Sequence, residues 1–177
     1  MVRVVLDKEL ENKVIDKGWE RYRANRRQGI KNKKIGRQSN WFTDINGLGG
    51  EVAFAQYFGV DHSWAEDTGR GGHDAVVDGV TVDVKTTDYR DGMLLGKYER
   101  RHEPKADIYF LVTGELPVYR LRGWIEADEL FRDCNLLRLR DPTYALDQEA
   151  LRPVPSQSQV REATGSELAP RATVETC

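Results

Sequence analysis

Residues 73–87 read HDAVVDGVTVDVKTT, two valine-rich runs on either side of the dipeptide Asp78-Gly79. An Asp-Gly pair between such runs predicts a β-hairpin with a two-residue turn, in which both turn positions have positive φ. In the register of that turn, Asp74 lies opposite Asp83 on the same face of the sheet. The hairpin is therefore expected to bring two carboxylates together at its open end.

The second strand of the hairpin has one apolar face and one charged face. Side chains alternate along a strand, so Val80, Val82 and Val84 point one way, whereas Asp83 and Lys85 point the other. Neighbouring carboxylates repel each other unless a positive charge lies between them. A hard divalent cation bound by oxygen atoms suits this position, with the lysine beside it.

A simpler interpretation of the hairpin stays open. Asp74 could be a solvated turn residue, and Asp83 with Lys85 could face water on an edge strand. The segment upstream favours the first interpretation, because it supplies a third carboxylate.

Residues 46–58 predict a helix that ends at Gly59 and carries an inward-facing glutamate. Glu51 lies three residues after Leu48 and four before Ala55, so it shares their apolar side of the helix. Charged groups are seldom buried without a partner or a metal. The alternative for Glu51 is a position near the positive end of the helix dipole.

Together these residues resemble the PD-(D/E)XK nuclease superfamily, whose fold is called restriction-endonuclease-like. The resemblance is carried by Glu51 on an early helix, then Asp74, then Asp83-Val84-Lys85 on the next strand.

The resemblance covers about residues 46–130. Residues 107–114 (DIYFLVTG) and 118–130 (VYRLRGWIEADEL) look like the later core strands and the helix that follows them. The chain departs from the family pattern at His73, which stands where the name-giving proline would be. The gap between the two aspartates is also short for the family, and the hairpin register makes that gap workable.

The resemblance implies an α/β fold with a central mixed sheet flanked by helices, and a metal-dependent DNA endonuclease. Mg²⁺ is the implied cofactor, and Mn²⁺ could substitute. Asp74 and Asp83 would be direct ligands, with the main-chain carbonyl of Val84 as a third. Glu51 would bind a metal-held water or a second ion. Lys85 would orient the attacking water, and could act as a base only if its pKa were strongly lowered.

Three parts are expected along the chain. They are a basic helical arm (1–45), a nuclease core (46–151) and a tail (152–177) that is disordered or loosely docked. The expected elements are helices over 9–27, 46–58 and 126–133 and strands near 74–77, 80–87, 107–113 and 118–124.

Positive charge is concentrated at the front of the chain. Residues 1–40 hold twelve lysines or arginines and five aspartates or glutamates, a net +7, whereas the whole chain carries −2. Such a cluster can follow a phosphate backbone, although a solubilising surface is the alternative. The candidate DNA-binding residues are Arg26, Arg27, Lys31, Lys33, Lys34, Arg37 and, in the glycine-rich run before Asp74, Arg70.

Composition predicts a cytoplasmic protein. The two cysteines form no disulfide framework, and no apolar run approaches the length of a signal peptide or a membrane span. DNA is the expected partner, and a homodimer would be needed to cut both strands, since one site cuts one strand.

Two other functions remain open. One is a nucleic-acid-binding module that keeps the fold without catalysis, and the other is a structural or interaction protein whose carboxylates bind a stabilising cation.

Overall fold

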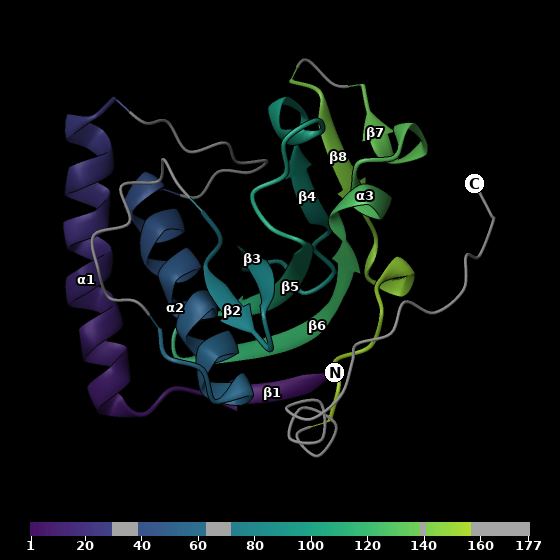
Figure 1. Ribbon diagram of the computed structural model, residues 1–177. Helices are drawn as coiled ribbons and strands as arrows, with labels where there is room; N and C mark the ends of the chain where they lie inside the picture. Colours follow the sequence, from purple (N-terminus) through teal and green to yellow (C-terminus); the bar gives the residue numbers. More distant parts are fainter. Residues whose placement is uncertain (30–38, 63–71, 139–140, 157–177) are drawn as a thin grey trace.

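The computed structural model describes residues 1–29, 39–62, 72–138 and 141–156. Its strands form a five-stranded and a three-stranded sheet (Figure 1). The first sheet contains, in spatial order, β1 (Val2–Val5), β6 (Val118–Glu126), β5 (Ile108–Glu115), β3 (Val80–Thr87) and β2 (Ala75–Val77). The second contains β4 (Leu94–Lys97), β8 (Thr143–Leu146) and β7 (Leu136–Leu137).

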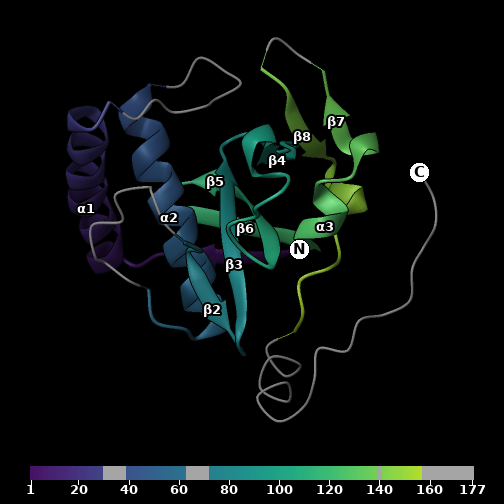
Figure 2. The ribbon, with the colours of Figure 1, turned by 45° about the horizontal axis from the view of Figure 1, so that its top comes forward.

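Two long helices lie on one side of the five-stranded sheet. These are α1 (Lys8–Arg27) and α2 (Asn40–Phe58), and α2 packs on the sheet while α1 packs on α2 (Figures 1 and 2). The short helix α3 (Ala127–Leu130) follows β6, and single 3-10 turns occur at Tyr98–Arg100, Asp133–Asn135 and Gln148–Ala150. The structure is therefore a mixed α/β fold with a sheet flanked by helices, as the sequence predicts.

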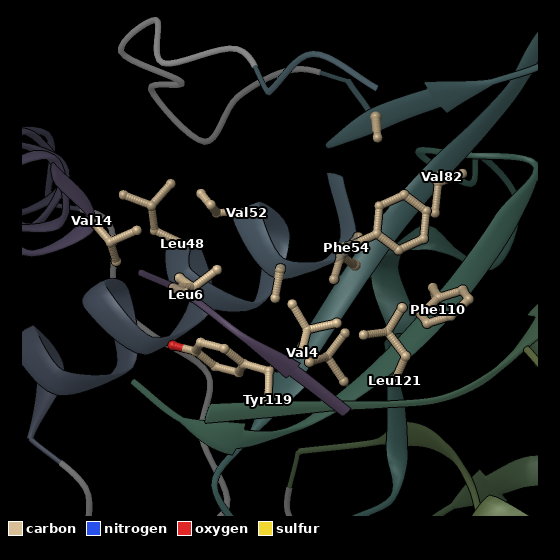
Figure 3. Packing of buried hydrophobic residues seen from close by; sticks show 14 of the residues in the cluster. Val4, Leu6, Val14, Leu48, Val52, Phe54, Val82, Phe110, Tyr119 and Leu121 are labelled. Carbon is tan, nitrogen blue, oxygen red and sulfur yellow. The ribbon is translucent and has the colours of Figure 1, made fainter. Parts of the chain in front are cut away.

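Two apolar clusters hold the layers together, one on each face of the five-stranded sheet. Between α2 and the sheet, Phe54 packs against Phe110 with ring centroids 4.9 Å apart, and Val82 lies beside them (Figure 3). On the opposite face, Leu111 of β5 packs with Leu94 of the small sheet. Alternation along the strands thus supplies apolar side chains to both faces.

The predicted hairpin is confirmed. Ala75 pairs with Val82 across β2 and β3, and the turn residues Asp78 and Gly79 have φ values of 52° and 82°. Beyond the hairpin, β3 pairs in parallel with β5. The sheet is mixed for this reason, because its other neighbouring strands are antiparallel.

The front of the chain differs from the sequence prediction in two ways. The helix expected over 46–58 ends as predicted but begins at Asn40, because the Ser39 hydroxyl caps it by accepting the Phe42 N–H at 3.3 Å. The helical arm expected over 1–45 begins with β1, which pairs with β6 at the edge of the main sheet. Helix α1 itself was predicted nearly to its ends.

Residues at the start of the expected tail are docked on the core. The Arg152 guanidinium donates to Glu126 at 2.9 Å and lies over the Trp124 ring at 4.8 Å. The Tyr57 hydroxyl donates to the Pro155 carbonyl at 2.8 Å. Residues 157–177 lie outside the described residues.

No helix within the described ranges is both long and apolar enough to cross a membrane.

Adjacent glycines bring α2 into close contact with the sheet. A Cβ at Gly49 would overlap the Tyr119 hydroxyl, and a Cβ at Gly50 would overlap the Thr86 side chain. Glu51 follows directly, so this close approach sets how near its carboxylate lies to the hairpin.

Replacement of Gly50 by Ala should lower the free energy of unfolding by about 1–3 kcal/mol, because the methyl group pushes α2 away from β3. Gly47→Ala is the matched control on the same helix, since nothing lies within 4 Å of a Cβ there. That variant should be stabilised by up to about 1 kcal/mol through helix propensity. Urea denaturation measures both changes in the free energy of unfolding. Equal changes in the two variants would contradict the close contact between α2 and β3 at Gly50.

Candidate functional site

The charged face of β3 lies on the side of the sheet opposite α2. Asp83 is only 5% exposed, and its carboxylate forms an ion pair with the Lys85 ammonium. The Lys85 Nζ atom also lies 5.7 Å from the ring centroid of Tyr109 on β5, a cation–π contact. The parallel register sets Tyr109 beside Asp83. Strand β5 therefore lies against one side of the Asp83–Lys85 ion pair.

Asp74 reaches the same strand from the bend before β2. Its main-chain N–H donates to the Val82 carbonyl at 2.8 Å, and its side-chain Oδ2 accepts the Val84 N–H at 2.7 Å. Strand pairing ends at Ala75, so Asp74 is not part of the regular ladder. The bend turns its carboxylate across β3, next to the residue whose carbonyl was the expected third ligand.

The environment of Asp74 identifies a carboxylate cluster. Burial, together with the negative charges of Glu51 and Asp83, raises the pKa of Asp74 to about 8, while Lys85 and the Val84 N–H act in the opposite direction. Burial is the largest cause of this shift, and the charges of the two other carboxylates add to it. The structure therefore brings Glu51, Asp74 and Asp83 into one electrostatic site, although they come from a helix, a bend and a strand.

Glu51 is held by cationic partners from outside the hairpin. Its side chain is 11% exposed, and Arg21 Nη1 donates to both carboxylate oxygens at 2.8 and 3.0 Å. His62 Nε2 lies 3.5 Å from Oε2. Burial alone would raise the pKa of Glu51, but the charge of Arg21 and the hydrogen bonds from His62 and Arg21 hold that pKa below its ordinary value. Glu51 is therefore ionised at neutral pH.

Arg21 and His62 were not among the site residues predicted from sequence. Arg21 follows the buried residues Val14 and Gly18 of α1 by seven and three positions, so it lies on the inward stripe of that helix. That spacing could have identified Arg21 as an inward-facing charge. No local spacing marks His62, which meets Glu51 only because α2 ends at Gly59 and the chain turns.

Lys85 is a charged ammonium in this arrangement. Burial would lower its pKa, but the charges of Asp83 and Asp74 and the hydrogen bond to Asp83 raise the pKa above its ordinary value. The geometry therefore suits donation of a hydrogen bond by Lys85. The base role required a strongly lowered pKa, which the described surroundings of Lys85 do not produce.

Only part of the predicted DNA-binding set lies in the described residues. Arg26 and Arg27 form the last turn of α1, where Arg27 is exposed and Arg26 lies 5.4 Å from the ring centroid of Tyr22. The other candidates fall outside the described ranges; they are Lys31, Lys33, Lys34, Arg37 and Arg70.

The oxygen atoms of the site suit a hard cation. Among the described residues, no three His, Cys, Asp or Glu side chains are already arranged as a metal-binding group. Asp74 and Asp83 nonetheless offer carboxylate oxygens close to the main chain of Val84, and a cation between them would offset the repulsion that raises the Asp74 pKa. Glu51 would have to share its carboxylate with Arg21.

Comparison with known proteins gives one match. No curated protein and no solved structure matches the chain. Residues 2–139 match a family described as a family of unknown function, DUF5843, and this range includes the whole carboxylate cluster. Because the match extends over most of its length, the chain belongs to the DUF5843 family.

Proposed function

We propose that this protein is a Mg²⁺-dependent endonuclease that hydrolyses phosphodiester bonds in DNA. The observation that carries the proposal is that Asp74, Asp83 and Lys85 lie together at the hairpin. The negative charges of Glu51 and Asp83 both act on the Asp74 carboxyl group. Buried carboxylates that repel each other are a site for a cation. A lysine beside them can contact the phosphate whose charge the cation offsets.

Each residue would have a distinct task. Asp74 and Asp83 would hold the cation together with the main-chain carbonyl of Val84. A bound Mg²⁺ would acidify a water and neutralise charge on the phosphate, and Mn²⁺ could take its place. Lys85 would donate a hydrogen bond to the attacking water or to the phosphate. Glu51 would accept a hydrogen bond from a water of the site.

The restriction-endonuclease-like fold is part of this proposal. It is supported by the mixed sheet, in which the strand carrying Asp83 and Lys85 lies between its hairpin partner and a parallel strand. It is also supported by α2, which brings Glu51 to the hairpin from the other face. A second copy of the chain would be required to cut both strands of a duplex.

Supercoiled plasmid and a branched DNA incubated with the purified protein test the proposal. Cutting is expected with Mg²⁺ or Mn²⁺, none with EDTA, and a loss of at least about 10²-fold in the Lys85→Ala variant. Lys8→Ala is the control, because Lys8 is exposed on α1 and pairs only with Glu11 in the described residues. Cutting that persists in EDTA, or in Lys85→Ala at the wild-type rate, would refute the proposed site.

One observation favours the alternative of a DNA-binding module without catalysis. Arg21 neutralises Glu51, which leaves fewer free carboxylate oxygens for a cation. Binding of both DNAs without cutting in either metal would support this alternative.

A further inference from the structure

The sheet face that carries Lys85 continues to the opposite edge of the sheet. Two residues after Lys85, Thr87 pairs with Thr113 on β5, Thr113 pairs with Arg120 on β6, and Arg120 pairs with Arg3 on β1. Paired residues share a face, so these side chains form a row across four strands. The row ends in two arginines set directly opposite each other.

Like charges in a directly opposed pair destabilise a sheet. Arg3 is exposed and Arg120 is half-buried, and neither forms an ion pair within the described residues. This arrangement costs stability in the free protein, and an anion bound between the two guanidinium groups would offset that cost.

A β-bulge adds a third arginine to the same edge. Leu121 pairs with Val112 and Gly123 pairs with Leu111, which leaves Arg122 as the extra residue on β6. Bulges bend a strand locally and redirect the side chain of the extra residue. Here the bulge directs Arg122 toward Thr113, in the row described above.

Within the described residues, the Arg122 guanidinium donates hydrogen bonds to neutral acceptors. It donates to the Thr113 hydroxyl at 2.6 Å, to the Met1 sulfur at 2.9 Å and to the Arg90 carbonyl at 3.0 Å. The last contact brings a fourth arginine to the group, and Arg90 is exposed.

Only part of the charge of this cluster is offset by a carboxylate in the described residues. Burial and the charges of Arg120 and Arg90 lower the pKa of Arg122, and Asp91 offsets part of that effect. Neither Arg90 nor Arg122 forms an ion pair in the part of the chain that the structure describes. Planar guanidinium groups that form no ion pair with a carboxylate match the geometry of phosphate oxygens.

We propose that Arg3, Arg90, Arg120 and Arg122 form a phosphate-binding surface on which the backbone of duplex DNA lies as it approaches Lys85. That the phosphate belongs to DNA rests on the proposed function. With strands about 4.8 Å apart and a rise of about 3.3 Å per residue, the Cα atoms of Lys85 and Arg120 are about 12 Å apart. That span corresponds to about three to four base pairs along a duplex, so one DNA segment can contact both.

The test measures DNA affinity without cleavage. A labelled short duplex is titrated with the Arg3→Gln/Arg120→Gln double variant in EDTA at several salt concentrations. The affinity should fall by about tenfold near 0.1 M salt, and the slope of log K against log salt should become shallower by about 2, because two phosphate contacts are lost. Arg132→Gln/Arg138→Gln is the matched control, with both arginines exposed beside the small sheet. Wild-type affinity and slope in the Arg3/Arg120 variant would overturn the proposal.

Two further measurements separate a binding role from a structural one. The Arg3→Lys/Arg120→Lys variant keeps the charges and should recover most of the affinity and the salt slope; binding as weak as in the glutamine variant would overturn the proposal. Thermal unfolding of the glutamine variant should give a Tm at or above the wild-type value, since repulsion is removed. A lower Tm would show that the arginines serve the fold, and would overturn the proposal.

Inorganic phosphate distinguishes DNA from a small anion. The assignment to DNA would be overturned by two results together: phosphate stabilises the wild type but not the glutamine variant, and the two proteins bind the duplex with equal affinity. Binding is measured in EDTA, so it does not depend on cleavage. If the protein binds duplex DNA through these arginines but never cuts it, the phosphate-binding surface stands and only the proposed nuclease activity is refuted.

Discussion

Replacement of Asp83 by Asn should reduce metal-dependent DNA cleavage by at least about 10³-fold, because it removes several kcal/mol of charge stabilisation from the site. The substitution removes one negative charge with almost no change in side-chain volume. The amide oxygen can still accept a hydrogen bond from Lys85, which is Asp83's partner in the structure. We therefore expect the fold to persist, with a circular dichroism spectrum like that of the wild type.

Asp78→Asn is the matched control for this prediction, on the same hairpin. Asp78 is exposed and has a φ of 52°, a conformation that Asn adopts readily. Its replacement should leave the cleavage rate unchanged. If Asp83→Asn cleaves at the rate of Asp78→Asn, then Asp83 is not a metal ligand and the proposed site is wrong.

The second large effect concerns stability rather than cleavage. Replacement of Asp74 by Asn should raise the free energy of unfolding of the metal-free protein at pH 8 by at least about 3 kcal/mol, and the Tm by at least about 6 °C. The reason is that the Asp74 pKa is raised to about 8 in the folded protein, mainly by burial and then by Glu51 and Asp83.

The sign of the pH dependence follows from this shift. The unfolded chain loses the Asp74 proton near its ordinary pKa of 3.8, whereas the folded protein holds it to about pH 8. The folded state is therefore progressively destabilised as pH rises from about 4 to 8, and not below that range. Thermal unfolding at pH 4, 6 and 8 should show a difference between variant and wild type that grows with pH.

Asp107→Asn should behave in the opposite way. The Thr81 side chain and main chain donate to Asp107, and these bonds lower its pKa. Its replacement should destabilise the protein at neutral pH, and the loss should shrink as pH falls through the lowered pKa. An Asp74→Asn variant that is destabilised at pH 8, as Asp107→Asn is, would contradict the carboxylate cluster.

The effect of Mg²⁺ on thermal stability tests the role of Asp74 independently. A ligand that binds only the folded state raises the free energy of unfolding by RT ln(1 + [L]/Kd). Mg²⁺ at pH 8 should therefore raise the Tm of the wild type and leave that of Asp74→Asn nearly unchanged.

Local signals in the sequence were sufficient for the elements around the site. The Asp78-Gly79 turn determined the hairpin register, because only a two-residue turn with two positive φ values joins those strands. Gly59 ends α2 in the left-handed conformation, as its position after the apolar stripe predicts. The alternation within residues 80–87 correctly placed Asp83 and Lys85 on the face opposite to Val82 and Val84.

Long-range pairing explains what the sequence did not predict. Strand β1 is a short edge strand without a turn signal, and it is stabilised by β6, more than a hundred residues later. The small sheet was missed for the same reason, since Leu94 pairs with Leu146 across a large part of the chain. Arg21 and Glu51 meet only because α1 packs on α2. None of these partners is set by local spacing.

The parallel pairing of β3 with β5 determines when the site can form during folding. The β2–β3 and β5–β6 hairpins each close through a two-residue turn, and such hairpins form within about 1–10 μs. Joining them in parallel requires closure of the connection over residues 88–107, which includes β4, whose own partner β8 comes later in the chain. Contacts of this kind form late, because loop closure must precede them. Tyr109 therefore lies beside Asp83 and Lys85 only after β5 has docked on β3, so the site is completed late in folding.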